Sequence, residues 1–343
     1  MKILKLEKSD LDKWLAEWMK SSPVYAPVQS GFGSFYDWAR LEQGRMPELL
    51  PGVPKSSIKT FLFPQPETLE EFSADPADPS AFILKAPKTA EQLTIIAGVR
   101  PCDARSVSLN ALPYAKDPYY SNRLRNTALV GFTCETQCST CFCTRTGGLP
   151  TGTEGLDIAI TRMDNTFLAE ILTQKGELLA EAGRTGTDAG GDALSRLEQS
   201  RKNSGSPVSS ADDPAPILRE KDLMALYQAP FWQEIAEPCL NCGACTFLCP
   251  TCYCFDIQDE VIRDRGRRIR YWDSCMFPLF TLHASGHNPR GLKLQRVRNR
   301  FMHKLKYFPE RFGPISCVGC GRCIRECPVN IDIREVYTDL LAI

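Results

Sequence analysis

Two segments near the C-terminal end of the chain share one cysteine spacing, C-x2-C-x2-C-x3-C-P. They occupy residues 239–250 and 317–328. In each, three thiols fall within one short loop, and small residues such as Gly243 let the backbone come close to whatever the thiols bind. A fourth cysteine followed by proline completes the pattern, which is the ligand spacing of bacterial 4Fe-4S clusters.

Two copies of this pattern predict two 4Fe-4S clusters. In two-cluster ferredoxins the fourth cysteine of each motif ligates the other cluster. The alternative is a pair of structural zinc sites, but these use paired C-x2-C knuckles, and a triple run gives the wrong number of thiols per loop. The predicted ligands of the first cluster are Cys239, Cys242, Cys245 and Cys327, and those of the second are Cys317, Cys320, Cys323 and Cys249.

The other cysteines and the overall composition indicate the compartment. The chain has 16 cysteines in 343 residues, and charges interrupt its first residues too early for the apolar core of a signal peptide. No run approaches the ~18 apolar residues that span a bilayer. We therefore expect a protein without a membrane span in a reducing compartment, the cytoplasm, where metal ligation is the better interpretation of many cysteines. With 41 basic and 41 acidic residues, the zero net charge also argues against nucleic acid as a partner.

The chain divides by its patterns into an α+β or α/β N-terminal domain and a mostly helical, two-cluster ferredoxin-like domain. Short apolar runs at 81–84, 93–97 and 128–132 predict buried strands in the first. A stretch rich in Gly, Ser, Asp and Pro predicts an exposed linker. The predicted boundaries are 1–180, 181–216 and 217–343, and the helices expected in the last part lie within 221–235, 258–270, 292–305 and 333–343.

A basic segment is hidden in the neutral total. Residues 263–306 contain twelve Lys and Arg but only two acidic residues, Asp264 and Asp273. Three interpretations remain open: a solvated helix face, a docking face for an acidic partner, or positive charge near the clusters that stabilises their reduced form. The sequence shows no nucleotide-binding glycine motif or hydrolase motif, so the chain is not expected to begin or end a redox reaction alone.

Four further motifs carry a family resemblance. They are G-V-R-P-C-D at 98–103, C-x6-C-F-C at 134–143, C-P-T-C-Y-C-F at 249–255 and W-D-S-C at 272–275. Together, over about 55–328, they resemble the iron-sulfur electron-transfer subunits of sulfhydrogenases, of anaerobic sulfite reductase and of flavin oxidoreductases associated with heterodisulfide reductase. The resemblance implies an anaerobic oxidoreductase complex in which single electrons pass between a flavin- and NAD(P)H-binding reductase subunit and a catalytic redox subunit of hydrogenase, sulfite reductase or heterodisulfide reductase type.

The same resemblance implies a third 4Fe-4S cluster in the N-terminal domain. Structural buried thiols or a redox pair are the alternatives, and Cys138 is left as an extra thiol. Cys252, Cys254 and Cys275 are interpreted as packing near a cluster. The alternative is another metal site, which Asp273 or His287 would complete as the fourth ligand. The rival functions are a catalytic reductase subunit with its own substrate-reducing iron-sulfur or thiol centre, and a zinc-organised scaffold. The implied ligands of the third cluster are Cys102, Cys134, Cys141 and Cys143.

Overall fold

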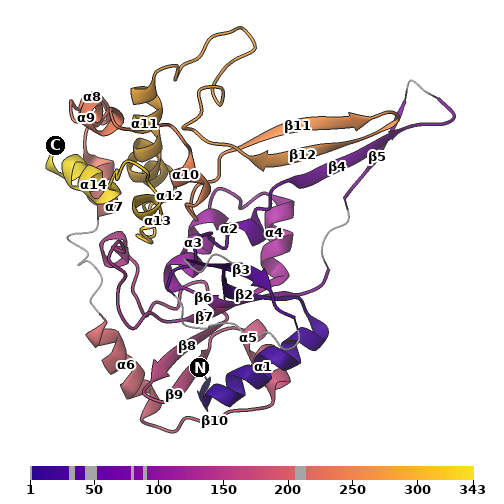
Figure 1. Ribbon diagram of the computed structural model, residues 1–343, viewed down its shortest axis with the longest axis vertical. Coiled ribbons are helices and arrows are strands. Elements are labelled where there is room, and N and C mark those ends of the chain that lie inside the picture. The colour runs from indigo at the N-terminus through magenta and orange to yellow at the C-terminus, as the bar shows by residue number, and fades with distance from the viewer. Residues whose placement is uncertain (1, 31–34, 43–51, 79–80, 88–90, 205–213) are drawn as a thin grey trace.

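A computed structural model describes residues 2–30, 35–42, 52–78, 81–87, 91–204 and 214–343. Its strands form two sheets (Figure 1), one of eight strands in the body of the N-terminal half and one of four strands that projects from it. The C-terminal helices pack above the larger sheet. Within the described residues, no helix combines the length and apolar character that a bilayer crossing requires.

The larger sheet has the order β10-β1-β9-β8-β7-β6-β2-β3. Its centre is parallel, since β2, β6, β7 and β8 pair in that sense, and its flanks are antiparallel. The strands are β1 (Lys2–Leu6), β2 (Val24–Gln29), β3 (Tyr36–Arg40), β6 (Thr94–Val99), β7 (Thr127–Phe132), β8 (Ile158–Met163), β9 (Thr166–Ile171) and β10 (Thr187–Asp188).

Both faces of this sheet are covered, as the continuous apolar character of its central strands requires. Along β6, Ile95 and Ala97 face one core while Ile96 and Val99 face the other. The first core includes α1, whose buried Leu11, Trp14, Leu15 and Trp18 follow helical spacing. The helices of the N-terminal half are α1 (Lys8–Ser21), α2 (Lys59–Leu62), α3 (Pro101–Ala111), α4 (Pro118–Arg125), α5 (Gln174–Gly183) and α6 (Ala193–Asn203).

The mixed α/β character predicted for the N-terminal region is confirmed by this sheet, and the strands expected at 93–97 and 128–132 are β6 and β7. Because these two strands are parallel neighbours, their carboxyl ends meet at one edge. Cys102 lies in the first turn of α3 directly after β6, and Cys134 follows β7. The fold therefore brings the first cysteines of the chain to the same edge of the sheet.

The helix expected at 258–270 is wrong, because these residues form most of an exposed β-hairpin. Its two-residue turn is Arg263–Asp264, and Arg263 has a φ of 59°. Cross-strand ion pairs join Arg267 to Glu260 and Arg268 to Asp259, so the alternating charges support strand pairing instead of a helix face. The C-terminal part is consequently less helical than predicted.

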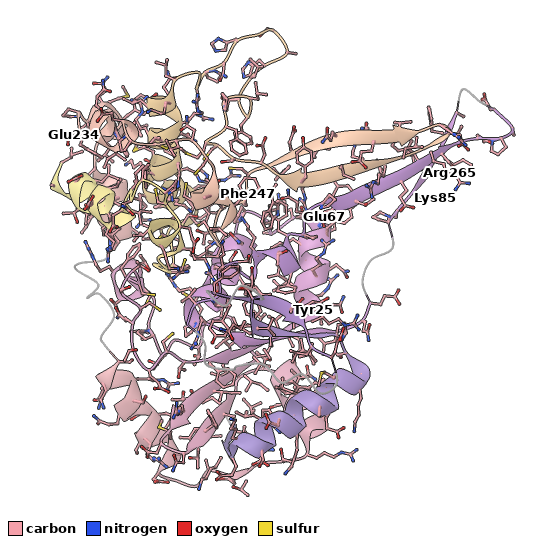
Figure 2. The ribbon with its side chains drawn as sticks, viewed as in Figure 1. Tyr25, Glu67, Lys85, Glu234, Phe247 and Arg265 are labelled. Carbon is pink, nitrogen blue, oxygen red and sulfur yellow. The ribbon has the colours of Figure 1, made fainter. Side chains whose placement is uncertain are left out.

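This hairpin belongs to the four-stranded sheet, hereafter the arm, in the order β11-β12-β4-β5. Because β12 pairs with β4, the two predicted domains share one sheet. Figure 2 shows Glu67 at the base of the arm and Lys85 and Arg265 towards its far end. The run at 81–84 was expected to be a buried strand, but β5 is exposed along its length. The strands are β4 (Glu67–Ala74), β5 (Phe82–Lys85), β11 (Phe255–Ile262) and β12 (Arg265–Trp272).

The C-terminal helices surround a third core that includes Trp232, Phe301 and Val336. Part of the expected linker is ordered: α6 packs Ala193 and Leu197 against Leu168 of β9, whereas residues 205–213 lie outside the described residues. The helices are α7 (Pro214–Glu220), α8 (Leu223–Gln228), α9 (Trp232–Ala236), α10 (Ala244–Phe247), α11 (Lys293–Met302), α12 (Phe308–Phe312), α13 (Arg322–Arg325) and α14 (Ile333–Ala342).

Candidate iron-sulfur centres

A cavity between α10, α11 and α13 brings together the four cysteines predicted for the first cluster. Gly243 has a φ of 77° and starts α10, so the thiols of its motif turn around one loop. Apolar side chains, including Met276 and Val297, close the rest of the wall. The cysteines that line this cavity, hereafter the first cavity, are the predicted Cys239, Cys242, Cys245 and Cys327, together with Cys323 of the second predicted set.

A second cavity lies on the other side of α13. Its walls include Lys304, Phe142 and Ile333. The four cysteines predicted for the second cluster line it: Cys249, Cys317, Cys320 and Cys323.

Arg300 on α11 gives a direct test of whether the first cavity suits a sulfide-rich group. The residue is only 5% exposed and lines the cavity, yet its Nε and Nη2 atoms have no hydrogen-bond partner among the described residues. Leaving buried cationic donors unpaired is costly, so an acceptor is expected at this place. Thiolates and sulfides of a bound cluster are acceptors of this kind, and the cavity therefore fits the predicted group.

Lys304, one helical turn after Arg300, places a buried positive charge beside the cysteines of the second cavity. Its Nζ donates to the sulfur of Cys249 over 3.3 Å and to Thr251 Oγ1 over 3.0 Å. The nearby sulfurs of Cys249 and Cys252 raise the pKa of Lys304 despite complete burial, so the side chain stays cationic. It lies in a π-helical turn, His303–Tyr307, which continues α11 and alters the spacing of its side chains.

Part of the basic segment identified in the sequence is thus internal. Arg296, Arg300, Lys304 and Lys306 are buried, and only Arg300 and Lys304 of these reach the cysteines. Of the three interpretations of the segment, positive charge near the clusters describes these two residues. Arg267 and Arg268 of β12 instead form ion pairs within the arm.

The cysteines predicted for a third cluster lie near one another but do not line a single cavity. Cys102 and Cys143 share one cavity with Arg105, whose Nη1 atom has no hydrogen-bond partner in the described part of the chain. Cys134 and Cys138 line another cavity, which is distinct from the first and second cavities. Cys138, predicted to be an extra thiol, forms a hydrogen bond with Cys141. The pKa of Cys134 is raised to about 11 by burial, so a metal that binds it must displace a proton.

The cysteines predicted for the third cluster, hereafter the third group, lie beside the second cavity. The Phe142 N–H donates to Gly319 O over 2.9 Å, and the Cys141 thiol lies 3.9 Å from Cys320 O. A Cβ atom on Gly319 would meet the backbone of Cys143 at 2.5 Å, which explains a glycine there. The loop 317–323 therefore supplies cysteines to the second cavity and also contacts the third group.

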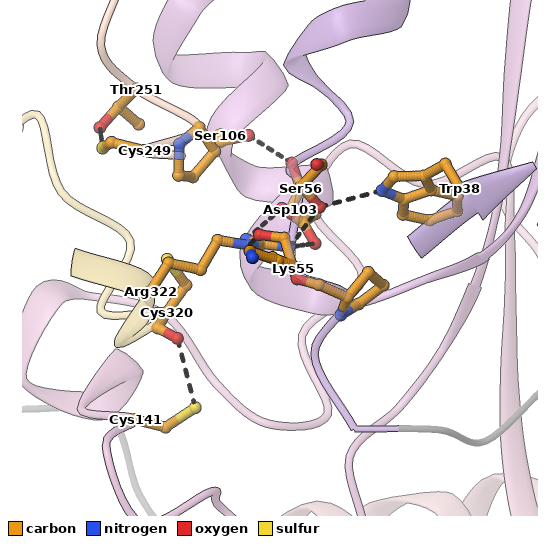
Figure 3. A network of polar contacts seen from close by, with 12 residues as sticks. Trp38, Lys55, Ser56, Asp103, Ser106, Cys141, Cys249, Thr251, Cys320 and Arg322 are labelled. Atoms are coloured by element: carbon orange, nitrogen blue, oxygen red, sulfur yellow. Dashed lines mark hydrogen bonds and ion pairs between the residues drawn. The ribbon is translucent and has the colours of Figure 1, made fainter. Parts of the chain in front are cut away.

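A buried ion pair fixes this junction (Figure 3). Asp103, next to Cys102, accepts two hydrogen bonds from Arg322, which stands between Cys320 and Cys323 in the sequence. Arg322 also donates to Ser56 O over 3.1 Å. The sequence contained a signal for this pair, since Arg322 interrupts one cysteine motif and Asp103 belongs to the G-V-R-P-C-D motif, but no spacing rule connects them.

The remaining cysteines are not isolated. Cys252 forms a hydrogen bond with Cys249 of the second cavity, and Cys254 forms one with Cys275. His287 is exposed, and its ring lies 5.4 Å from that of His283. In the described residues, no three His, Cys, Asp or Glu side chains converge as closely as one metal ion requires. A cubane cluster keeps its four thiolates further apart than a single ion does.

The comparisons with known proteins agree with this arrangement. Residues 238–331 match the family of 4Fe-4S dicluster domains. With both motifs in that domain, the chain is an iron-sulfur electron-transfer subunit. It is 31% identical over 251 residues to the sulfhydrogenase 2 subunit beta of Pyrococcus furiosus, which covers 72% of this chain and 73% of the relative. The chain belongs to the family of that beta subunit. No solved structure matches it.

Proposed function

We propose that the chain carries three 4Fe-4S clusters and relays single electrons between a flavin- and NAD(P)H-binding reductase subunit and a catalytic redox subunit. The main support for this proposal is that each of two adjoining cavities is lined by one of the cysteine sets that the motifs predict. Clusters of this kind supply one-electron transfer when bound. The chain's own residues hold them, exclude water and place positive charge beside them.

The proposed order of the relay follows from how the cavities adjoin. Cys323 lines both the first and the second cavity, so the two share a wall. On its other side, the second cavity borders the third group through Gly319 and Phe142. A path from the third group through the second cavity to the first is therefore continuous, and one partner would dock near each end.

The partner types and the compartment are also proposals. A relative that is a sulfhydrogenase subunit supports a complex with a hydrogenase-type catalytic subunit. Sulfite reductase and heterodisulfide reductase types rest on the resemblance of the motifs. A reducing cytoplasm is proposed because the sixteen cysteines of this long chain are better interpreted as metal ligands than as disulfides.

An anaerobic iron analysis of the purified full chain tests the cofactor content. Three clusters correspond to about twelve iron atoms per chain and two to about eight, while dominant zinc would refute the clusters altogether. The third site is tested by Cys141→Ser and Cys143→Ser, which we expect to lower the count by about four. Cys138→Ser is the matched control, because Cys138 contacts Cys141 but is not a proposed ligand.

An activity measurement distinguishes the relay from a catalytic subunit. The isolated, fully loaded chain should accept electrons from a reduced viologen and pass them to a one-electron dye. We expect it not to reduce sulfite, a disulfide or protons at a rate above that of the dye mixture alone. Sustained turnover of any of these substrates would contradict the relay.

A further inference from the structure

Cys254 and Cys275 meet at the base of the arm, outside the first and second cavities. Cys254 directly precedes β11, and Cys275 follows β12 after Asp273 and Ser274. The Asp273 N–H donates to Cys254 O over 3.0 Å, which continues the strand pairing past Trp272. The hairpin therefore sets the distance between the two cysteines, although twenty residues separate them in the sequence.

The two thiols contact each other and differ in environment. Cys275 donates hydrogen bonds to the Cys254 sulfur from its side chain and from its backbone N–H. Cys275 is 8% exposed, whereas Cys254 is only partly buried. The hydrogen bond from Cys275 lowers the pKa of Cys254 to about 7, and the same contact raises the pKa of Cys275. A partly buried thiol with a lowered pKa beside a buried thiol with a raised pKa is the arrangement of a reactive dithiol.

Two side chains, Cys252 and Lys59, link this pair to the second cavity through short contacts. The Cys252 thiol, two residues from Cys254, forms a hydrogen bond with Cys249. The buried Lys59 donates to Cys252 O over 3.1 Å, and its Nζ lies 4.0 Å from the centre of the Trp272 ring. The charge of Lys59 helps to stabilise a thiolate at Cys254. Nothing in the proposed relay uses Lys59, Cys252 or the pair itself.

We propose that Cys254 and Cys275 are a redox-active dithiol–disulfide couple that exchanges two electrons with the clusters, one at a time. Reduction of the disulfide breaks its S–S bond, takes up two electrons and two protons, and gives two thiols. Each electron comes from one 4Fe-4S cluster, whose charge changes from 1+ to 2+. In the opposite direction the two thiols are oxidised: the S–S bond forms, two protons are released, and two oxidised clusters each accept one electron. The proposal rests on the proposed relay, and it adds a two-electron store to a chain of one-electron carriers.

Thiol mapping of the full holoprotein tests the couple. The protein is held anaerobically at a high and at a low potential with redox dyes, denatured in acid with a thiol-alkylating reagent and digested with trypsin. Because Lys or Arg stands at 221, 263, 270 and 290, the two cysteines fall in peptides 222–263 and 271–290, and Cys275 is the single cysteine of the second. We expect these peptides to be linked at the high potential and separate at the low one.

Three variants make the result specific. Cys254→Ser and Cys275→Ser should each abolish the link and remove two electrons per chain from a coulometric titration, with unchanged iron content. Cys252→Ser should keep the link, which assigns the partner of Cys275 to Cys254. Full alkylation of Cys275 at both potentials would overturn the couple. A loss of about four irons in Cys254→Ser or Cys275→Ser would also overturn it, because the thiols would then be ligands. The iron count of the unaltered chain separately reports whether the relay has its clusters.

Discussion

Arg322 and Asp103 form a two-pronged ion pair in which neither side chain has any exposed surface, with N–O distances of 2.7 and 2.8 Å. Arg322 lies in the cysteine loop 317–323 beside the second cavity, and Asp103 lies in the first turn of α3, beside Cys102. The pair therefore connects the two halves of the chain where their cysteines adjoin.

Removing one partner should be far more damaging than removing an exposed ion pair. Asp103→Asn leaves the buried cation of Arg322 without a counter-charge, and we expect a loss of about 3–5 kcal/mol in the free energy of unfolding. Anaerobic urea unfolding measures it. Glu17→Gln, which breaks the exposed Lys20–Glu17 pair, is the control and should cost less than about 1 kcal/mol. Equal losses for both variants would contradict a structural role for the buried pair.

Arg300 should raise the reduction potential of the cluster in the first cavity. Reduction adds negative charge beside its guanidinium, so Arg300→Gln should lower the potential. The interaction energy between the charge of a residue lining the cavity and the added electron is about 1–3 kcal/mol at an effective dielectric constant near 20. This energy corresponds to a shift of roughly 40–130 mV in the potential of a one-electron couple. A redox titration followed by electron paramagnetic resonance measures the shift.

The control for Arg300 is its neighbour on the same helix. Arg298 stacks on Tyr227 and lines neither cluster cavity. Arg298→Gln removes the same charge with the same substitution, and its potential should stay near that of the unaltered chain. If both variants shift the potential equally, the effect is one of net charge, and the proposed contact is refuted.

Gly319→Ala should disturb two groups of cysteines together. Gly319 has a φ of 63°, and an added Cβ would collide with the backbone of Cys143. We expect a loss of about four or more irons, because neither the second nor the third site can close around its ligands. Gly286→Ala separates strain from collision: Gly286 has a φ of 83° but open space around its Cβ position. That variant should keep its iron and lose about 1 kcal/mol of stability.

His303 should make the protein less stable as the pH falls. Burial, together with the charges of Lys304 and Arg290, lowers the pKa of His303 to about 4. Between the ordinary pKa of about 6.5 and this value the unfolded chain binds a proton that the folded chain does not, so stability decreases as pH decreases. From pH 7.5 to 5.5 the contribution is about 1 kcal/mol. Urea midpoints at both pH values should show a smaller decrease for His303→Gln, and an identical decrease would show that His303 does not contribute.

Sequence spacing predicted the parts of the centres that are local. Three thiols at C-x2-C-x2-C fit one loop because neighbouring residues have little freedom to be elsewhere, and the structure places each predicted set around one cavity. The continuous apolar runs of β6 and β7 likewise identified two buried parallel strands, with Cys102 and Cys134 at their ends. In these cases the information lies within a few residues of the chain.

The remaining features depend on partners far apart in the sequence. Whether residues 258–270 form a helix or a strand was decided by pairing of β12 with β4, almost two hundred residues away. The same hairpin brings Cys254 to Cys275, and helix packing turns Arg300 and Lys304 from an apparent surface charge run towards the cysteines. The sequence by itself identified the two sets of cysteines that line the first and second cavities. Only the tertiary structure decided which charges and spare thiols lie beside them, because burial and electrostatic contact are set by packing between distant segments.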